Sequence, residues 1–399
     1  MHGSGSPATP VAPVDPPHDG YYRMTVLEQC WGWVAGGPDT ALPAVPAGRW
    51  SPGHALEAAV RPALERPPCL VSFSGGRDSS LVLAVALRVA RREGLDAPVA
   101  FTRRFPGLDE AQEADWQEEI ARFLHVGEWV RLDIHDELDL VGPVSGPSLR
   151  AHGMLWHPLV HQRVFDFSRA KGGSFVDGEG GDELFAPGRL MPLRALVTSR
   201  RPPSVRGLAS AALAVAPAPV RGSAYRRHYR RHLQMPWLRP AARADFDRAV
   251  AADRAAEPAD HRRALWQHRH LRGVSLMLRN MTRLASEADV VLSHPLLDDR
   301  VTASVAAAGG AVGFPGREHA MRRLFGDLLP EALLARRSKA RFNRVAFNVH
   351  SRAFARSWDG RGLDEDLVDP EALRQTWLAD EPHGLSFALL QSAWLAAQR

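Results

Sequence analysis

The segment CLVSFSGGRDSS, residues 69–80, decides the fold of this chain. Its first five residues, 69–73, form an apolar run of strand length, and Gly75 and Gly76 end that run. The next stretch, 81–93, carries apolar residues at helical spacing. A strand, a glycine turn and a helix in succession are typical of one unit of a parallel sheet covered by helices.

The same alternation continues along the chain. Apolar runs predict further strands at 97–102, 128–134 and 173–177, and helices at 110–124 and 157–170. Residues 260–310, 317–337 and the C-terminal quarter are expected to be mainly helical. We therefore predict an α/β fold whose parallel, five-stranded-type sheet has helices on both faces. Because ligands bind at the carboxyl ends of such strands, the loops after residues 73 and 177 become the candidate site.

Composition indicates a folded, cytoplasmic protein. The 399 residues include 45% hydrophobic residues, which is enough to build a core. Two cysteines, Cys30 and Cys69, exclude a disulfide framework and a four-cysteine zinc site. We find no run of about 18 apolar residues that would span a membrane, and no signal-peptide pattern at the N-terminus.

Charge is distributed unevenly. The formal charge is +5, from 50 basic and 45 acidic residues, and only Lys171 and Lys339 are lysines. A predicted helical segment, 184–244, holds 12 arginines and no acid, which leaves the rest of the chain at −7. An anionic partner is expected there, either an acidic precursor peptide, an acidic protein or, less favoured, a tRNA; a solvated helix face is the alternative. We expect a Pro/Gly-rich, partly disordered extension at 1–50 and one domain at 51–399.

The loop SGGRDSS, residues 74–80, has the features of a phosphate site. Its glycines let backbone N–H groups approach an anion closely, and the following helix adds its positive end. An aspartate among phosphate donors makes sense beside a cation, which makes Asp78 a candidate Mg²⁺ ligand. The loop lacks the GxxxxGK[ST] pattern of a Walker loop. A glycine turn capped by Asp78 and Ser79 is the structural alternative.

A second loop, DGEGGDELF at residues 177–185, follows another predicted strand. Its four carboxylates would repel one another in a plain turn, whereas beside a metal and a nucleophile they become useful. Asp182 would complete a Mg²⁺ site with Asp78, and Glu179 would take a proton from an attacking amine if it is shielded from water. An exposed acidic turn is the alternative.

These loops carry a resemblance to a known family. SGGRDSS resembles the SGGxDS[ST] loop of the PP-loop ATP pyrophosphatases, and GEGGDELF resembles the GEGxDE(L/V)F segment of the asparagine synthetase C-terminal domain. HPLLD at 294–298 is similar to the family's (V)PFLD stretch. The residues Leu329, Pro330, Leu333, Leu334, Arg337, Lys339 and Phe342 resemble its LPxxLL and RxKxxF stretches. The four segments span about two-thirds of the chain.

The resemblance implies ATP and Mg²⁺ as cofactors and an acyl-adenylate as intermediate. Carried over position by position, Asp78 and Asp182 would ligate Mg²⁺, and Glu179 would be the base toward the amine. Lys339 would support the phosphates during adenylation, which makes it, with Glu179, the second catalytic residue. The positions carried over as nucleotide-binding are Ser74, Gly75, Gly76, Asp78, Ser79, Ser80, Gly178, Gly180 and Lys339.

Departures from the family pattern concern the substrate. The sequence has His2 where glutamine-using members have a cysteine, so no internal glutaminase is expected. Asp177 replaces the family's serine before GEG, and the stretch LExRVPFLD reads VVLSHPLLD here, so that its Glu and Arg have become Val291 and Ser293. These changes resemble the diverged synthetase domains of lasso-peptide macrocyclases.

The sequence therefore predicts an AMP-forming carbon–nitrogen ligase that forms a peptide or natural-product amide, for example by lasso-type macrocyclisation. An ammonia-dependent asparagine synthetase, or a partner-supplied amidotransferase, is the alternative within the same class. A tRNA-modifying PP-loop enzyme is a third possibility, although the sulfur-inserting members need cysteine pairs that are absent here. From a different class, an idle module that binds peptides through its basic segment remains to be excluded.

Overall fold

The computed structural model describes residues 20–37, 44–45, 49–107, 114–198, 202, 204–335 and 343–398. The catalytic residue expected at Lys339 lies outside these described residues, as do Arg337 and Phe342 and the first 19 residues of the chain.

A five-stranded parallel sheet forms the centre of the α/β part, as predicted. Its strand order is β3-β2-β1-β4-β5, and all four pairings are parallel. Four strands lie within two residues of their predicted bounds, but residues 291–293, expected within a helical stretch, pair with β4 as the fifth strand. The strands are β1 (Cys69–Ser72), β2 (Val99–Arg104), β3 (Trp129–Asp133), β4 (Ser174–Val176) and β5 (Val291–Ser293).

Helices cover both faces of the sheet, because successive strand side chains point to opposite sides. On β1, Val71 packs into one core with α2 (Pro52–Leu64), α3 (Arg77–Glu93), α4 (Ala114–Phe123) and α14 (Asp299–Gly309). Leu70 packs into a second core on the opposite face with α6 (Arg163–Phe167) and α13 (Arg272–Glu287). The helix predicted at 157–170 is a 3₁₀ turn, Pro158–Gln162, followed by the short α6.

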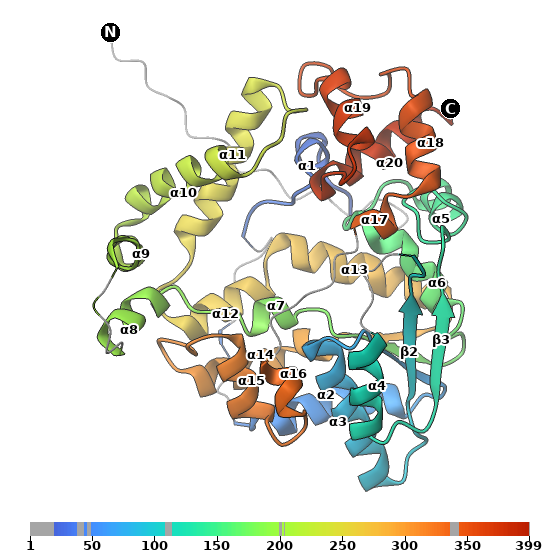
Figure 1. Cartoon of the computed structure of the whole chain (residues 1–399), viewed down its shortest axis with the longest axis vertical. Coiled ribbons are helices and arrows are strands. Elements are labelled where there is room, and N and C mark those ends of the chain that lie inside the picture. The colour runs from blue at the N-terminus through green and yellow to red at the C-terminus, as the bar shows by residue number, and fades with distance from the viewer. Residues whose placement is uncertain are drawn as a thin grey trace.

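A third core joins the N-terminal segment to the C-terminal helices. Trp31 of α1 (Val26–Trp31) is buried and donates from its indole N–H to the carbonyl of Ala242 at 3.1 Å. In Figure 1, α1 lies beside α19 (Pro370–Leu378) and α20 (Phe387–Ala396), and α1 and α20 are in contact. Residues 20–37, within the stretch 1–50 that the sequence marks as a partly disordered extension, therefore pack against the folded body.

The Arg-rich segment is helical, as expected. Its helices α8, α9 and α10 lie along one side of the molecule, away from the sheet (Figure 1). In the described part of the chain, no helix is long and apolar enough to cross a membrane. The remaining helices are α5 (Ser145–His152), α7 (Gly181–Leu184), α8 (Met191–Thr198), α9 (Val205–Val215), α10 (Ala218–His232), α11 (Pro240–Ala256), α12 (His261–Arg269), α15 (Arg317–Phe325), α16 (Glu331–Ala335), α17 (Asn343–Ala346) and α18 (Val349–Ser357).

Candidate active site

The loop between β1 and α3 has the geometry of an anion site. Gly75 adopts a φ of +82°, and a Cβ at this position would lie 2.8 Å from the Cγ of Gln117, so only glycine fits without strain. Gln117 fixes the loop by donating to the carbonyl of Ser74 at 3.0 Å. Gly76 caps α3 without a side-chain hydrogen bond. The first N–H groups of a 17-residue helix therefore face the loop, where the helix dipole favours an anion.

Two serine hydroxyls preorganise this loop. The hydroxyls of Ser74 and Ser79 lie 3.0 Å apart, and Ser79 also donates to the carbonyl of Gly76 at 3.2 Å. The N–H of Gly76 donates to the hydroxyl of Ser74 at 3.3 Å. These internal hydrogen bonds hold the loop in one conformation, which lowers the entropy cost of binding an anion.

The acidic loop lies directly against the phosphate loop. A Cβ on Gly178 would come within 2.9 Å of the backbone N of Ser79, and one on Gly181 would come within 2.2 Å of the Cγ of Asp78. Gly180 has a φ of +92° and abuts Leu297. Glycine is thus required here for close approach between two loops that are about 100 residues apart in sequence.

Asp78 and Asp182 meet at a single guanidinium, and we call these three residues the Arg317 cluster. Arg317, at the start of α15, donates through one nitrogen to Asp78 and through the other to Asp182. The second oxygen of Asp78, Oδ1, is buried and has no hydrogen-bond partner among the described residues. Burial raises the pKa of Asp78 above its usual value, although the positive charge of Arg317 opposes this shift.

This arrangement fits the Mg²⁺ site that the sequence predicts. Two carboxylates close enough to share one guanidinium can share a cation, and the unpartnered Oδ1 of Asp78 offers a further acceptor. Within the described ranges, no group of three or more His, Cys, Asp or Glu residues is placed to hold a metal by itself. The other ligands of a Mg²⁺ ion would therefore be water and nucleotide phosphates, which is how this ion is usually bound.

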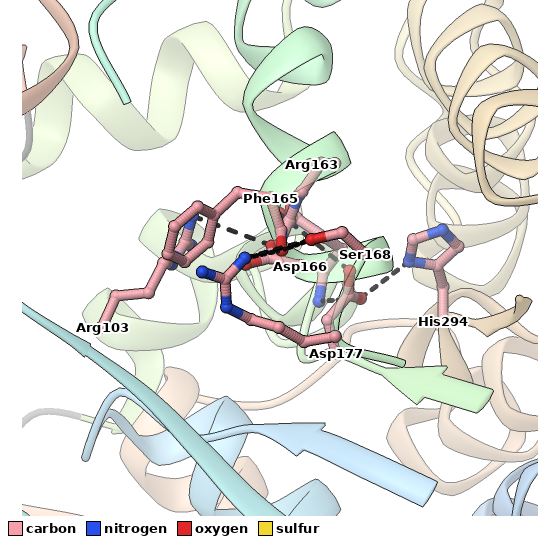
Figure 2. Close-up of polar contacts among 9 residues, drawn as sticks. Arg103, Arg163, Phe165, Asp166, Ser168, Asp177 and His294 are labelled. Carbon is pink, nitrogen blue, oxygen red and sulfur yellow. Dashed lines mark hydrogen bonds and ion pairs between the residues drawn. The ribbon is translucent and has the colours of Figure 1, made fainter. Parts of the chain in front are cut away.

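A second guanidinium holds the other carboxylates of the acidic loop, and we call this set the Arg163 cluster: Arg163, Asp166, Asp177, Glu179 and His294. Arg163 donates to Glu179 at 2.7 Å and lies 3.4 Å from Asp166 and from Asp177. On the other side of Asp177, the Nδ1 of His294 lies 2.7 Å from its carboxylate (Figure 2). Two of the positions that differ from the family pattern, 177 and 294, are therefore in direct contact.

Charge pairing favours the ionised forms of Asp177 and Arg163 despite their burial. Burial alone would raise the pKa of Asp177, but His294 and Arg163 hold it below its usual value. Burial would likewise lower the pKa of Arg163, and the carboxylates of Asp177, Glu179 and Asp166 raise it instead. Glu179, the expected base, is thus held by Arg163 with 41% of its side chain exposed, so the shielding from water on which its role as a base was conditional is not present in the free protein.

Both clusters line one cavity of about 650 Å³. Of the predicted site residues, the cavity wall includes Ser74, Gly76, Asp78, Ser79, Gly178, Glu179 and Asp182. Gly75 and Gly180 shape the loops without lining the cavity, and Ser80, in the first turn of α3, is fully buried. Ser80 does not line the cavity in the free protein, and its contact with pyrophosphate stays a prediction.

Part of the cavity wall is apolar, and His157, Gln162 and Arg103 are polar residues of the same lining. The apolar residues come from several elements and are Phe73, Phe101, Phe105, Leu138, Leu159, Val160, Met277, Met281, Val345 and Ala346. Arg103, at the end of β2, has its closest carboxylate, that of Asp166, 3.8 Å away (Figure 2). The apolar part of the wall can accept an apolar group several atoms long.

Sequence reasoning missed the arginines and Gln117. Arg163 and Arg317 both organise the site, yet nothing local distinguishes them in a chain whose 50 basic residues include only two lysines. A signal was present at His294, because it replaces the valine of the family stretch. Its contact with Asp177, 117 residues away, is visible only in the fold.

Comparison with known proteins agrees with this geometry. The family model described as asparagine synthase matches residues 53–396, which is most of the chain. A search of curated proteins found no match. The matched region includes both loops, the cavity and the helices around it, and the family forms carbon–nitrogen bonds with the use of ATP. The chain therefore belongs to the asparagine synthase family.

Proposed function

We propose that this protein is an AMP-forming amide synthetase that adenylates a substrate carboxylate and passes the acyl group to an amine. The observation that carries the proposal is the convergence of the phosphate loop, the Arg317 cluster and Glu179 on one cavity. An anion site, a pair of metal-binding carboxylates and a candidate base are the groups that the two half-reactions need.

In the first half-reaction, a carboxylate oxygen of the substrate attacks the α-phosphorus of ATP, and the bond to the β-phosphate oxygen breaks to release pyrophosphate. The N–H groups at the start of α3 and the hydroxyls of Ser74 and Ser79 would bind the leaving pyrophosphate. Asp78 and Asp182 would hold Mg²⁺, which supplies charge neutralisation when bound. Lys339 is proposed to contact the same phosphates.

In the second half-reaction, the amine nitrogen attacks the acyl carbon and AMP leaves with the electrons of the broken C–O bond. The attacking amine must lose a proton, and Glu179 is the carboxylate that lines the cavity beside the acidic loop. Its hydrogen bond to Arg163 fixes the position of the carboxylate. One Glu179 oxygen, Oε1, accepts from Arg163, which leaves the other to receive the proton.

The apolar part of the cavity wall favours a substrate larger than aspartate and ammonia. A small polar acid finds no hydrogen-bonding side chain at Met277, Met281 and Leu159. A hydrocarbon side chain that packs against them would gain about 25 cal/mol per Å² of apolar surface that it removes from water. Formation of a peptide or natural-product amide, such as a lasso-type macrocycle, uses such a wall better. An ammonia-dependent asparagine synthetase is the alternative.

The test is substrate-dependent exchange of labelled pyrophosphate into ATP, run first with aspartate and then with a panel of peptides that carry an Asp or Glu side chain. We expect exchange with peptides and none with aspartate. Exchange with aspartate alone would establish the alternative. ATP binding without exchange on any carboxylate would contradict the proposal and favour an idle module. Lys339→Ala should abolish exchange while circular dichroism stays unchanged.

We further infer that the helices α8, α9 and α10, which we call the arm, bind an acidic and partly apolar polypeptide. On α9, the exposed residues Val205, Leu208, Ala212 and Val215 recur at spacings of three and four, so one face of the helix is apolar and outward. Val205 is 85% exposed. Such a face on a helix ordinarily packs against a partner.

The charge of the arm selects the kind of partner. Five arginines on α9 and α10 are exposed and form no ion pair among the described residues: Arg206, Arg226, Arg227, Arg230 and Arg231. An acidic precursor peptide or acidic protein with apolar side chains complements both features. The arm follows the acidic loop in the sequence, since α8 begins at residue 191.

Fluorescence anisotropy with a labelled peptide of alternating Glu and Leu blocks tests this docking surface. We expect binding that weakens at least tenfold in the R226E/R227E/R230E variant and is unchanged in R66E, which alters an exposed arginine elsewhere. Equal binding by the triple variant would overturn the inference. Preferential binding of phosphatidylglycerol vesicles or of tRNA would overturn it in favour of a membrane or RNA partner.

A further inference from the structure

Arg317 occupies the place between two carboxylates that the proposed function gives to a metal ion. It contacts Asp78 and Asp182 at the same time, and 22% of its side chain is exposed. Asp182 is 56% exposed, so this contact lies at the open side of the cavity. The two carboxylates converge on one positive charge in the free protein, and that charge belongs to the chain itself.

The positive and negative charges near Arg317 offset one another in the free protein, and they would do so again with a divalent cation and a triphosphate bound together. Arg77 also lines the cavity, and its positive charge lies close to that of Arg317. In the free protein, Asp78 and Asp182 offset the charges of the two arginines, and Glu318 adds a further negative charge near Arg77. If a divalent cation neutralises Asp78 and Asp182, the guanidiniums of Arg77 and Arg317 lose the negative charges of these two carboxylates. The phosphate oxygens of an arriving triphosphate replace those negative charges.

We infer that Arg317 is a further residue of the nucleotide site, which excludes the free divalent ion and moves to the phosphates when metal and nucleotide enter together. The inference rests on the proposed function, because it assumes that ATP binds in this cavity. It predicts two effects of opposite sign. Loss of Arg317 should strengthen the binding of Mg²⁺ alone and weaken the binding of the nucleotide.

The movement is physically open to this side chain. Its Nε atom is buried and makes no hydrogen bond within the described ranges, so its charged end is held only by the carboxylates. Guanidinium groups bind phosphate oxygens in the same planar, two-point manner as carboxylates. The side chain therefore exchanges one pair of acceptors for another.

The experiment measures Mg²⁺ alone, and then Mg²⁺ with α,β-methylene ATP, by calorimetry and by thermal unfolding. Arg317→Met is compared with Arg322→Met, a control on the same helix whose arginine pairs with Glu318 and Glu331 outside the cavity. We expect wild-type protein to show no unfolding shift with millimolar Mg²⁺ alone. R317M should bind Mg²⁺ at least tenfold more tightly and the nucleotide analogue roughly 10- to 100-fold more weakly.

Each outcome is decisive. Tight binding of Mg²⁺ alone by wild type, or unchanged binding of either ligand by R317M, overturns the inference. A wild-type protein that fails to bind the analogue overturns the proposed function instead, which separates the two failures. Arg317→Lys, which keeps the charge but loses the two-point contact, provides a second variant. It should fall between wild type and R317M in both measurements.

Discussion

The two arginine clusters on the cavity wall use the same chemistry in different environments. In the Arg317 cluster, Asp182 is 56% exposed and its arginine 22% exposed, whereas in the Arg163 cluster the arginine is 13% and Asp177 only 3% exposed. Arg163 also has three carboxylates around it instead of two. We infer that Arg317 can leave its two carboxylates, whereas Arg163 stays paired with its three.

The difference shows that the carboxylates of the acidic loop, residues 177–185, belong to two sites with different roles. Asp182, at one end of the loop, faces the phosphate site, while Asp177 and Glu179, at the other end, face Arg163. Asp78 and Asp182, which match the family pattern, lie at the exchangeable cluster. Asp177 and His294, two of the residues that depart from the pattern, lie at the fixed cluster, where Arg163 also holds the matching Glu179. We infer that the family chemistry is retained and that its acceptor side has been rebuilt.

The largest effect is expected when the proposed base is removed without a change of shape. Glu179→Gln should lower amide formation by about 10²- to 10⁴-fold, because the amine loses its proton acceptor. Pyrophosphate exchange should persist, since the Arg317 cluster is untouched. Quenched-flow separation of the two half-reactions measures both. Equal loss of exchange and amide formation would break the proposed division between the clusters.

The second largest effect is expected on the free energy of unfolding, which the two clusters should change by different amounts. Arg163→Met leaves buried Asp166 with only Arg103 at 3.8 Å and buried Asp177 with only His294, and it should reduce the free energy of unfolding by about 3–5 kcal/mol. Arg317→Met, at a more exposed site, should cost about 1 kcal/mol or less. Urea titrations of both variants provide the comparison. Similar losses from the two substitutions would show that burial does not separate the clusters as we describe.

A double-mutant cycle sharpens the account of the fixed cluster. Asp177→Ser removes the family departure after β4, and His294→Val removes the one after β5. Each single change leaves one charged or polar partner buried, while the double variant restores the family's pair of residues. The double variant should lose less free energy of unfolding than the two single variants lose together, by about 0.5–3 kcal/mol. Additive effects would mean that the 2.7 Å contact carries no coupling.

The smallest effect is a pH dependence. The pKa of Asp177 in the folded state is lowered, despite its burial, by His294 and Arg163. Its contribution to stability is therefore fully present above the unfolded value of about 4 and is lost as the pH falls through the folded value. Wild type should be more stable than Asp177→Asn at pH 6, and the difference should shrink below pH 4. A constant difference would contradict the shift.

Sequence reasoning reached the sheet and the two loops, because both are local signals. The strands at 69–72 and 174–176 are apolar runs followed by glycines, and that punctuation marks their carboxyl ends. The three-residue strand at 291–293 was missed because it follows α13 after only three residues and is too short to have a period of its own. Burial of Ser80 could not be seen in the motif, because it depends on how α3 rotates against the sheet.

The roles of Arg163 and Arg317 could not be predicted from the sequence for a different reason. Arg317 meets Asp78 across 239 residues and Arg163 meets Glu179 across 16, and neither spacing is a recognised pattern. Arginine is abundant throughout the chain, so its type carries no information either. The departures at Asp177 and His294 were visible one by one, but their pairing needs the parallel neighbours β4 and β5 to end side by side.

The central claim, that ATP is cleaved between its α- and β-phosphates at this cavity, has one direct test. Phosphorus-31 NMR of ATP, Mg²⁺ and an acyl–amine pair that supports turnover identifies the products. Our account predicts AMP and pyrophosphate in a one-to-one ratio with the amide, and no such products from Asp78→Asn. The appearance of ADP and inorganic phosphate would contradict it.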